Sequence, residues 1–283
     1  MYDSAMMGEM DRRCCRYADL VIASSEDLVE RCRCHSPNVH LVSHGVDHEH
    51  FAQALSEIPR PADLPEGRIA GFFGLLSEWL DQDLLIEIAG KVPECEIVLI
   101  GREDVAIDRL KNIPNVHLLG PRPFNRLPGY VKYFDVGLIP FVVNELTKAV
   151  NPIKLREMMS AGCPVVSTNL PEVALYGGVG ELLSCQVARL LSESPKDSLP
   201  STKRQPSSLS TTNECTPPVQ IAQNHDEFVS MVRSILDKPF PPAERQAISN
   251  SMASETWTSK VGEILALLQG CGGRADGHAG EDY

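Results

Sequence analysis

Short apolar segments alternate with amphipathic segments along most of the chain. The apolar runs are bounded by Gly, Pro or Asn and predict buried strands at 19–24, 68–74, 95–101, 115–120, 134–141, 163–168 and 219–222. Helices are predicted between them, at 78–92, where apolar residues recur at three- and four-residue steps, at 124–134, and at 153–162, which ends on Gly162. This alternation predicts an α/β fold, a Rossmann-like parallel sheet with helices on both faces.

Composition narrows the class of protein. The 283 residues are 43% hydrophobic, enough for one large or two modest domains with a real core. A formal charge of −12 has the wrong sign for a nucleic-acid binder, so we expect no nucleic acid as a partner. No apolar stretch approaches the roughly 20 residues that span a bilayer, and the first residues do not resemble a signal peptide. We therefore expect a cytoplasmic location.

The nine cysteines are an odd number, and several fall inside apolar strand patterns, as reduced thiols do. Cys14 and Cys15 could join Cys32, Cys34 and His35 in a zinc site. The Cys-x-Cys spacing is tighter than that of common zinc motifs, so ordinary thiols are favoured and no metal is expected.

One predicted helix carries a lysine and a glutamate close to its start, where a ligand could bind. In "NPIKLREMMSAGCPVVST", residues 151–168, Pro152 is suited to the first position of a helix, which would put Lys154 and Glu157 on one face of its first turns. At the carboxyl ends of a parallel sheet, such a lysine could neutralise a diphosphate and such a carboxylate could accept hydrogen bonds from ribose hydroxyls. An ordinary surface ion pair explains the spacing equally well.

A wider resemblance covers 19–176 and 219–260. The chain resembles the back half of a GT-B fold glycosyltransferase, in particular the family 4-like (glycosyl transferases group 1) enzymes that use nucleotide sugars. The matching segments are "ADLVIASSEDLVE", "NVHLVSHGVDHEHF", "GFFGLLSEWLDQDLL", "IVLIG", "NVHLLGPRPFNRLPGYVKYFDVGLIPF", "NPIKLREMMSAGCPVVSTNLPEV", "DEFV" and "TWTSKV".

The resemblance implies roles for particular residues. Glu157 corresponds to the second acid of the family's Glu-x7-Glu signature, whereas Ala149 replaces the first. Leu75, Leu76 and Ser77 stand where the family has its diphosphate-binding Arg and Lys, which leaves Lys154 as the local replacement. The catalytic candidates are Lys154 and Glu157, and the donor-binding candidates are Gly71 and Gly74 in a turn, Ser77, Gly120 and Arg122 in "GPRP", Asn151, Lys154 and Glu157.

Three histidines, His44, His48 and His50, lie in the segment "SHGVDHEHF", where the family commonly has Asn in place of His44. Their two- to four-residue spacing in a polar loop favours solvated histidines over a ligand set.

The resemblance implies that the protein transfers sugar from a nucleotide-sugar donor of UDP or GDP type to a glycan or lipid-linked acceptor in cell-envelope or capsular polysaccharide synthesis. It implies no cofactor, and a cytoplasmic location that allows peripheral attachment to a membrane. Two alternatives remain open. One is a non-catalytic nucleotide-binding or interaction module derived from a GT-B enzyme, and the other is a nucleotide-sugar epimerase.

The expected organisation has five parts. Residues 1–41 resemble the remnant of an N-terminal acceptor domain, and 42–179 and 219–269 form the donor domain with its closing helix. The Ser/Thr/Pro-rich insertion at 180–218 and the tail at 270–283 are expected to be disordered. The closing helix carries an apolar stripe of Trp257, Val261, Ile264, Leu265 and Leu268, which predicts self-association or capture by a partner chain.

Overall fold

The computed structural model describes residues 4–177 and 216–272. The predicted insertion at 180–218 and the predicted tail at 270–283 lie almost entirely outside these ranges. The disorder expected of both segments therefore stays a prediction, as do the domain boundaries.

Six parallel strands form the central sheet, in the order β5-β4-β3-β6-β7-β8. Their bounds are β3 Arg68–Phe73, β4 Cys95–Ile100, β5 Val116–Leu118, β6 Val136–Ile139, β7 Val165–Thr168 and β8 Val219–Ala222. The first strand in sequence, β3, lies inside the sheet, where Gly71 is opposite Val98 of β4 and Gly137 of β6. The chain order reverses beside β3, and in such sheets the crevice beyond the carboxyl ends at this point is where ligands bind.

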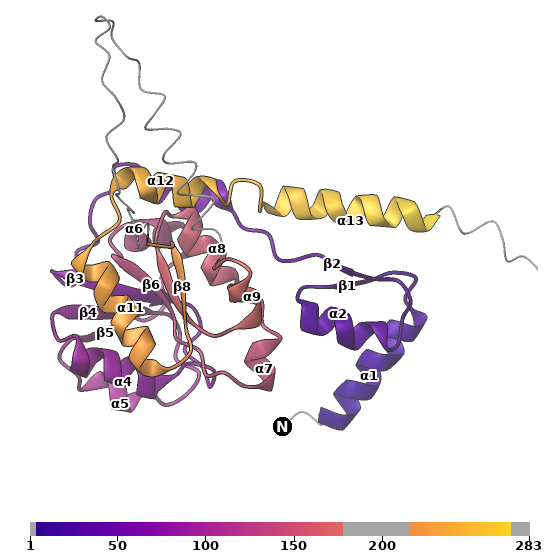
Figure 1. Cartoon of the computed structure of the whole chain (residues 1–283), viewed down its shortest axis with the longest axis horizontal. Helices are drawn as coiled ribbons and strands as arrows, with labels where there is room; N and C mark the ends of the chain where they lie inside the picture. The colour runs from indigo at the N-terminus through magenta and orange to yellow at the C-terminus, as the bar shows by residue number, and fades with distance from the viewer. Residues whose placement is uncertain (1–3, 178–215, 273–283) are drawn as a thin grey trace, which may run out of the picture.

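Helices cover both faces of the sheet, which confirms the predicted α/β fold (Figure 1). On one face, α4 (Gln82–Lys91) contacts β4 and α11 (His225–Asp237), and α11 contacts β6, β7 and β8. On the other face, α8 (Ile153–Ser160) packs on β6 and β7 and in turn contacts α3 (His48–Ala52) and α12 (Pro242–Asn250). The shorter helices are α5 Asp108–Lys111, α6 Leu127–Val131, α7 Glu145–Lys148, α9 Pro171–Ala174, and the 3₁₀ turns Gln53–Leu55 and Phe124–Arg126.

The start of α4 differs from the prediction. The apolar spacing extended the helix back to residue 78, but α4 begins at Gln82 because the Asp81 side chain accepts a hydrogen bond from Leu84 N at 2.9 Å and caps it. Leu80 instead forms an isolated β-bridge with Phe141. The capping residue, rather than the apolar period, sets where this helix starts.

The N-terminal segment forms a separate small unit. α1 (Ser4–Tyr17) is followed by β1 (Val21–Ala23), α2 (Glu26–Arg33) and β2 (Val39–Leu41), and the two strands pair in parallel. Ala23, Val29 and Val39 make its small core. Figure 1 shows this unit beside the six-stranded sheet and below the last helix.

The last helix, α13 (Trp257–Gly272), extends away from the six-stranded sheet (Figure 1). Trp257, Val261, Leu265 and Leu268 are each about half exposed, at 47–53%. Four of the five residues of the predicted apolar stripe are therefore exposed in the described structure, whereas Ile264 is only partly exposed.

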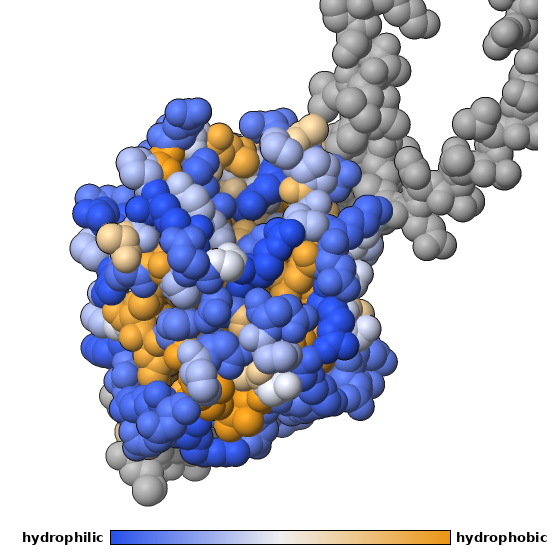
Figure 2. All heavy atoms as spheres, turned by 90° about the vertical axis from the view of Figure 1, so that its left-hand side faces the viewer, coloured by the Kyte–Doolittle hydropathy of each residue, from blue (hydrophilic) through white to orange (hydrophobic). Residues whose placement is uncertain are grey.

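The face of the molecule in Figure 2 is mainly hydrophilic, with hydrophobic residues visible in hollows between polar ones. The four inner strands of the sheet, β4, β3, β6 and β7, are almost completely buried, and β6 and β7 are buried at every residue. The edge strands β5 and β8 are only partly buried. No helix within the described ranges is both long and apolar enough to cross a membrane.

Candidate functional site

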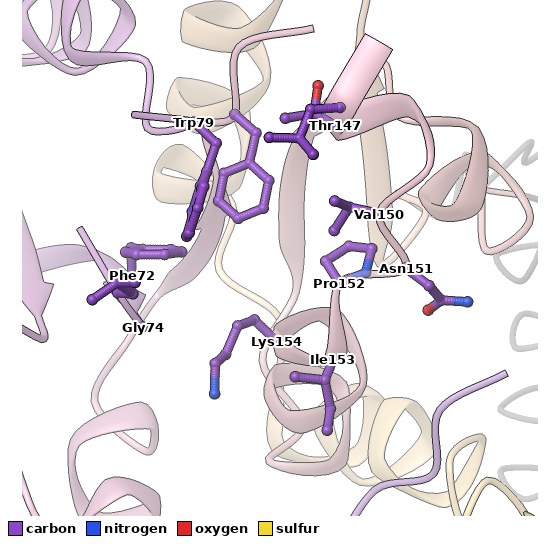
Figure 3. A pocket seen from close by; sticks show the side chains of 12 residues that line it. Phe72, Gly74, Trp79, Thr147, Val150, Asn151, Pro152, Ile153 and Lys154 are labelled. Carbon is purple, nitrogen blue, oxygen red and sulfur yellow. The ribbon is translucent and has the colours of Figure 1, made fainter. Parts of the chain in front are cut away.

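A cavity of about 350 Å³ lies at the carboxyl ends of the central strands, between the loop after β3, the loop after β6 and the start of α8 (Figure 3). Most of its wall is apolar and includes three aromatic rings. The lining residues are Phe72, Gly74, Leu75, Trp79, Phe141, Leu146, Thr147, Val150, Asn151, Pro152, Ile153 and Lys154. The cavity thus occupies the position where a doubly wound sheet binds ligands.

Lys154 reaches this cavity because of the way α8 begins. Pro152 is the N-cap of α8, so Lys154 lies in its first turn, and Gly162, at φ +71°, follows the end of the helix. The Lys154 Nζ donates a hydrogen bond to Glu157 Oε2 at 2.6 Å. The same nitrogen lies 4.8 Å from the centre of the Phe73 ring, within range of a cation–π contact.

Glu157 is a buried carboxylate, since its side chain is only 6% exposed whereas that of Lys154 is 26% exposed. Burial raises the pKa of Glu157, and the neighbouring charges of Lys154 and His50 oppose this shift without cancelling it. A surface ion pair would have neither this burial nor this shift, so the surface-pair alternative is wrong.

The two other polar residues of the wall already have hydrogen-bond partners. Thr147 Oγ1 donates to Val142 O and accepts from Asn144 N, which completes the cap of α7. Asn151 Nδ2 donates to Ser24 O at 2.8 Å and to Glu172 Oε2 at 2.9 Å. Among the residues of this wall, Lys154 is consequently the charged group that could meet an anionic ligand.

The two predicted turn glycines have different roles. Gly74 lies at the end of β3 with φ +153°, and a Cβ there would come 3.6 Å from Lys154 Cε. Gly71 is not in a turn, because it lies within β3. A Cβ at Gly71 would lie 2.2 Å from the Phe134 ring, so this glycine is required by packing, and its prediction as part of a phosphate-binding turn is wrong.

Five of the predicted donor-binding residues do not line the cavity, namely Gly71, Glu157, Ser77, Gly120 and Arg122. Ser77 is buried and its hydroxyl hydrogen bonds to Asp104 Oδ2 at 3.1 Å. Gly120 has φ +69° and its carbonyl accepts from Gly101 N. The Arg122 guanidinium pairs with Asp63 at 2.6 Å and also donates to the Tyr130 hydroxyl, so its charge is already compensated.

Sequence reasoning missed a buried polar network behind the cavity. Glu172, 4% exposed, accepts from Glu26 N at 2.9 Å with one carboxylate oxygen and from Asn151 Nδ2 with the other. Arg156, fully buried on α8, donates to Asn151 Oδ1 and lies 5.2 Å from the centre of the Tyr176 ring. The network joins the start of α2 to Asn151 in the loop before α8, and the only signal for it was "PEV" within the resemblance.

Gly101 was also missed as a site residue. A Cβ at this position would come within 1.6 Å of Gly74 O, so the close approach of the loops after β3 and β4 requires a glycine there. The glycine ending "IVLIG" was the signal.

The loop histidines do not form a metal site. His48 Nε2 hydrogen bonds to Ser249 O and His50 Nε2 to Phe124 O, each at 3.0 Å. Burial and the nearby Arg156 charge lower the pKa of His44, which lies beside the Trp257 ring. Among the described side chains no three His, Cys, Asp or Glu residues are grouped as metal ligands would be. The free thiols there are Cys14, Cys15, Cys32, Cys34, Cys95 and Cys163.

Comparison with known proteins gives a family match. Residues 67–193 match the family model described as glycosyl transferases group 1. Over 167 residues the chain is 32% identical to TuaH of Bacillus subtilis (strain 168), whose name assigns it to teichuronic acid biosynthesis as a glycosyltransferase. The match covers 56% of this chain and 42% of TuaH, so the chain spans less than half of that relative.

Solved structures give the same fold. HepE of Anabaena in complex with UDP superposes with a TM-score of 0.64 at 15% identity, covering 95% of this chain and 69% of HepE. Sucrose-phosphate synthase of Thermosynechococcus elongatus gives a TM-score of 0.63 at 14% identity, covering 96% of this chain and 63% of the synthase. Part of this chain is thus similar to the glycosyl transferases of group 1, and the chain shares the GT-B fold of these solved structures.

Proposed function

We propose that the cavity binds a nucleotide-sugar donor and that the chain is the donor-binding part of a glycosyltransferase. The observation that carries the proposal is the buried Glu157 carboxylate, held 2.6 Å from Lys154 in the first turns of a helix at the carboxyl end of the sheet. A carboxylate in such a place costs stability, because burial raises its pKa. A role in ligand binding accounts for its presence.

Each residue has a defined part in this proposal. The Lys154 ammonium would exchange part of its interaction with Glu157 for an interaction with the donor diphosphate. The diphosphate would then lie near the positive N-terminal end of α8. Glu157 would accept hydrogen bonds from the two ribose hydroxyls. Gly74 would allow the diphosphate to approach the chain beside Lys154, since a side chain there would contact Lys154.

The proposed reaction is displacement at the anomeric carbon of the donor sugar. The bond from that carbon to the diphosphate oxygen breaks, a bond to the acceptor oxygen forms, and the nucleoside diphosphate departs with the bonding electrons. Lys154 would stabilise the negative charge that grows on the departing oxygen. No metal or other cofactor is needed in this scheme.

Donor and pathway follow from the relatives as proposals. HepE was solved with UDP and with UDP-glucose, which favours a uridine donor, and the name of TuaH favours cell-envelope polysaccharide as the product. The acceptor would be a glycan or a lipid-linked saccharide, and the enzyme would work in the cytoplasm or at the periphery of a membrane.

Calorimetric titration with UDP, GDP and ADP tests the donor site. One nucleotide should bind the wild type, and Lys154→Gln and Glu157→Gln should each weaken that binding by about tenfold or more, the loss expected for a charge-assisted hydrogen bond. Glu145 and Lys148 form a matched control pair, because they are also three residues apart, at 2.8 Å, but are exposed. Lys148→Gln and Glu145→Gln should leave the affinity unchanged.

A folded wild type that binds none of the three nucleotides would refute the proposal. Incubation with UDP-sugars and product chromatography then separates the remaining functions. Transfer to an added acceptor supports a transferase, conversion of the sugar without an acceptor supports an epimerase, and binding without turnover supports a non-catalytic module.

A further inference from the structure

A second cavity, of about 460 Å³, lies at the opposite end of the sheet from the first. Arg68 is the first residue of β3 and Asp135 directly precedes β6, so this cavity opens at the amino ends of the central strands. Four of its lining residues are cations and one is an acid. The lining residues are Arg60, Gly67, Arg68, Lys132, Tyr133, Phe134, Asp135 and Arg245.

The cations outnumber the available carboxylates. Arg68 pairs with Asp135 at 2.8 Å. Arg60, Lys132 and Arg245 form no ion pair with any residue in the described ranges, so three positive charges face one cavity of a chain whose formal charge is −12. Such a concentration of uncompensated charge attracts anions.

Backbone carbonyls hold two of these cations in place. Lys132 Nζ donates to Ser56 O at 2.7 Å and to Ala54 O at 3.3 Å. Arg245 donates to Gly162 O at 3.0 Å through Nε and to Phe134 O at 3.2 Å through a terminal nitrogen. The charges are therefore positioned before any ligand arrives, which lowers the entropy lost on binding.

Arg60 supplies a donor without a partner. Its guanidinium lies 5.0 Å from the centre of the Tyr133 ring, and one terminal nitrogen donates to Pro65 O. Its Nε is buried and has no hydrogen-bond partner in the described structure. A buried N–H left unpaired costs free energy, so the hydrogen-bonding capacity of Arg60 is not used up within the protein.

We propose that this cavity binds a small ligand through a phosphate group, at a site separate from the nucleotide-sugar site. A phosphate offers several acceptor oxygens and up to two negative charges, which match planar guanidinium donors and a lysine around one space. The group could belong to a free diphosphate or phosphate ester, or to a lipid headgroup. The proposal does not depend on the nucleotide-sugar site.

Calorimetry with pyrophosphate in the Lys154→Gln chain tests the site, because that substitution weakens any binding at the first cavity. Pyrophosphate should still bind, and Lys132→Gln should weaken binding by about tenfold, while Lys132→Arg should largely retain it. Lys111→Gln is the control. Lys111 is the last residue of α5, where it pairs with Glu103 and Asp108, and Figure 1 shows α5 far from α6 and α12. Arg60→Gln gives an independent test in case one variant folds poorly.

Absence of pyrophosphate binding, or binding that Lys132→Gln and Arg60→Gln leave unchanged, would overturn the proposal. Sedimentation with phosphatidic acid vesicles separates the two sources of phosphate. Vesicle binding lost in Lys132→Gln identifies a headgroup, and pyrophosphate binding without vesicle binding identifies a free phosphate. Because UDP binding is measured separately, failure here leaves the donor proposal intact.

Discussion

Removing the charge of Lys154 tests whether the Glu157 carboxylate is as strongly buried as the structure indicates. Lys154→Met keeps most of the side-chain volume but removes the ion pair at 2.6 Å. Breaking a fully buried pair costs about 3–5 kcal/mol, and because Lys154 is 26% exposed we expect a smaller loss of about 1–3 kcal/mol near neutral pH.

The loss should depend on pH in a specific direction. Burial already raises the pKa of folded Glu157 above the ordinary value of 4.5, so its contribution to stability falls as pH rises through that value. Without Lys154 the folded pKa rises further, because an attractive charge is gone. The stability difference between the variant and the wild type should therefore be small near pH 4.5 and grow towards neutral pH.

Urea unfolding followed by circular dichroism at several pH values measures this difference. The double variant Lys154→Met/Glu157→Gln should recover most of the loss, since no buried carboxylate is left unpaired. Lys148→Met is the control, because its pair with Glu145 is exposed and should contribute nothing measurable. A loss that is equal at all pH values, or equal in the control, would refute the argument from burial.

Three further predictions concern packing, pH and association. Gly71→Ala should destabilise the protein by about 2–3 kcal/mol or prevent folding, because the new Cβ would lie 2.2 Å from Phe134. The double variant Gly71→Ala/Phe134→Leu should be more stable in thermal unfolding than Gly71→Ala alone, because the smaller leucine leaves room for the Cβ. Partial burial lowers the pKa of His225, but hydrogen bonds to Asp81 and Glu87, each at 3.0 Å, more than offset this, so the net shift is upward. The stabilising effect of His225 should be complete below pH 6.5 and disappear as pH rises through its higher folded pKa. If the melting temperature of His225→Gln depends on pH as strongly as that of the wild type, this prediction is wrong. Leu265→Glu/Leu268→Glu should reduce self-association in light scattering if the exposed face of α13 is the contact surface, whereas an unchanged mass would show that this face is not involved.

The sheet could be predicted closely from sequence because its four inner strands are buried on both faces. The predicted run at 95–101 is β4 at Cys95–Ile100, and the run at 219–222 is β8 without change. Buried parallel strands are continuously apolar and leave a clear pattern. Helix starts were less predictable, since at α4 a single hydrogen bond from Leu84 N to Asp81 overrides a good apolar period.

The candidate site was predictable only where its contacts are local. Lys154 and Glu157 meet because three residues separate them on a helix, and this spacing is visible in the sequence. Arg122 pairs instead with Asp63, 59 residues earlier, and no local pattern could have indicated that partner. Gly71 and Gly74 looked alike in sequence, and only the position of Phe134, on the neighbouring chain segment before β6, separates a packing glycine from a loop glycine.

The position of the Lys154 cavity depends on residues that are remote in sequence. Asn151, which lies in the loop between α7 and α8, is fixed by Ser24 O and by Glu172. Glu172 is in turn fixed by the backbone of Glu26 at the start of α2. Each oxygen of the buried Glu172 carboxylate has a donor, so displacing either segment would leave a buried charge partly unpaired, at a cost well above that of a surface contact. The N-terminal unit is therefore a structural part of the cavity even though it contributes no lining residue. The short apolar and polar patterns that predicted the sheet contain no trace of this dependence, because it rests on three segments that meet only in the folded chain.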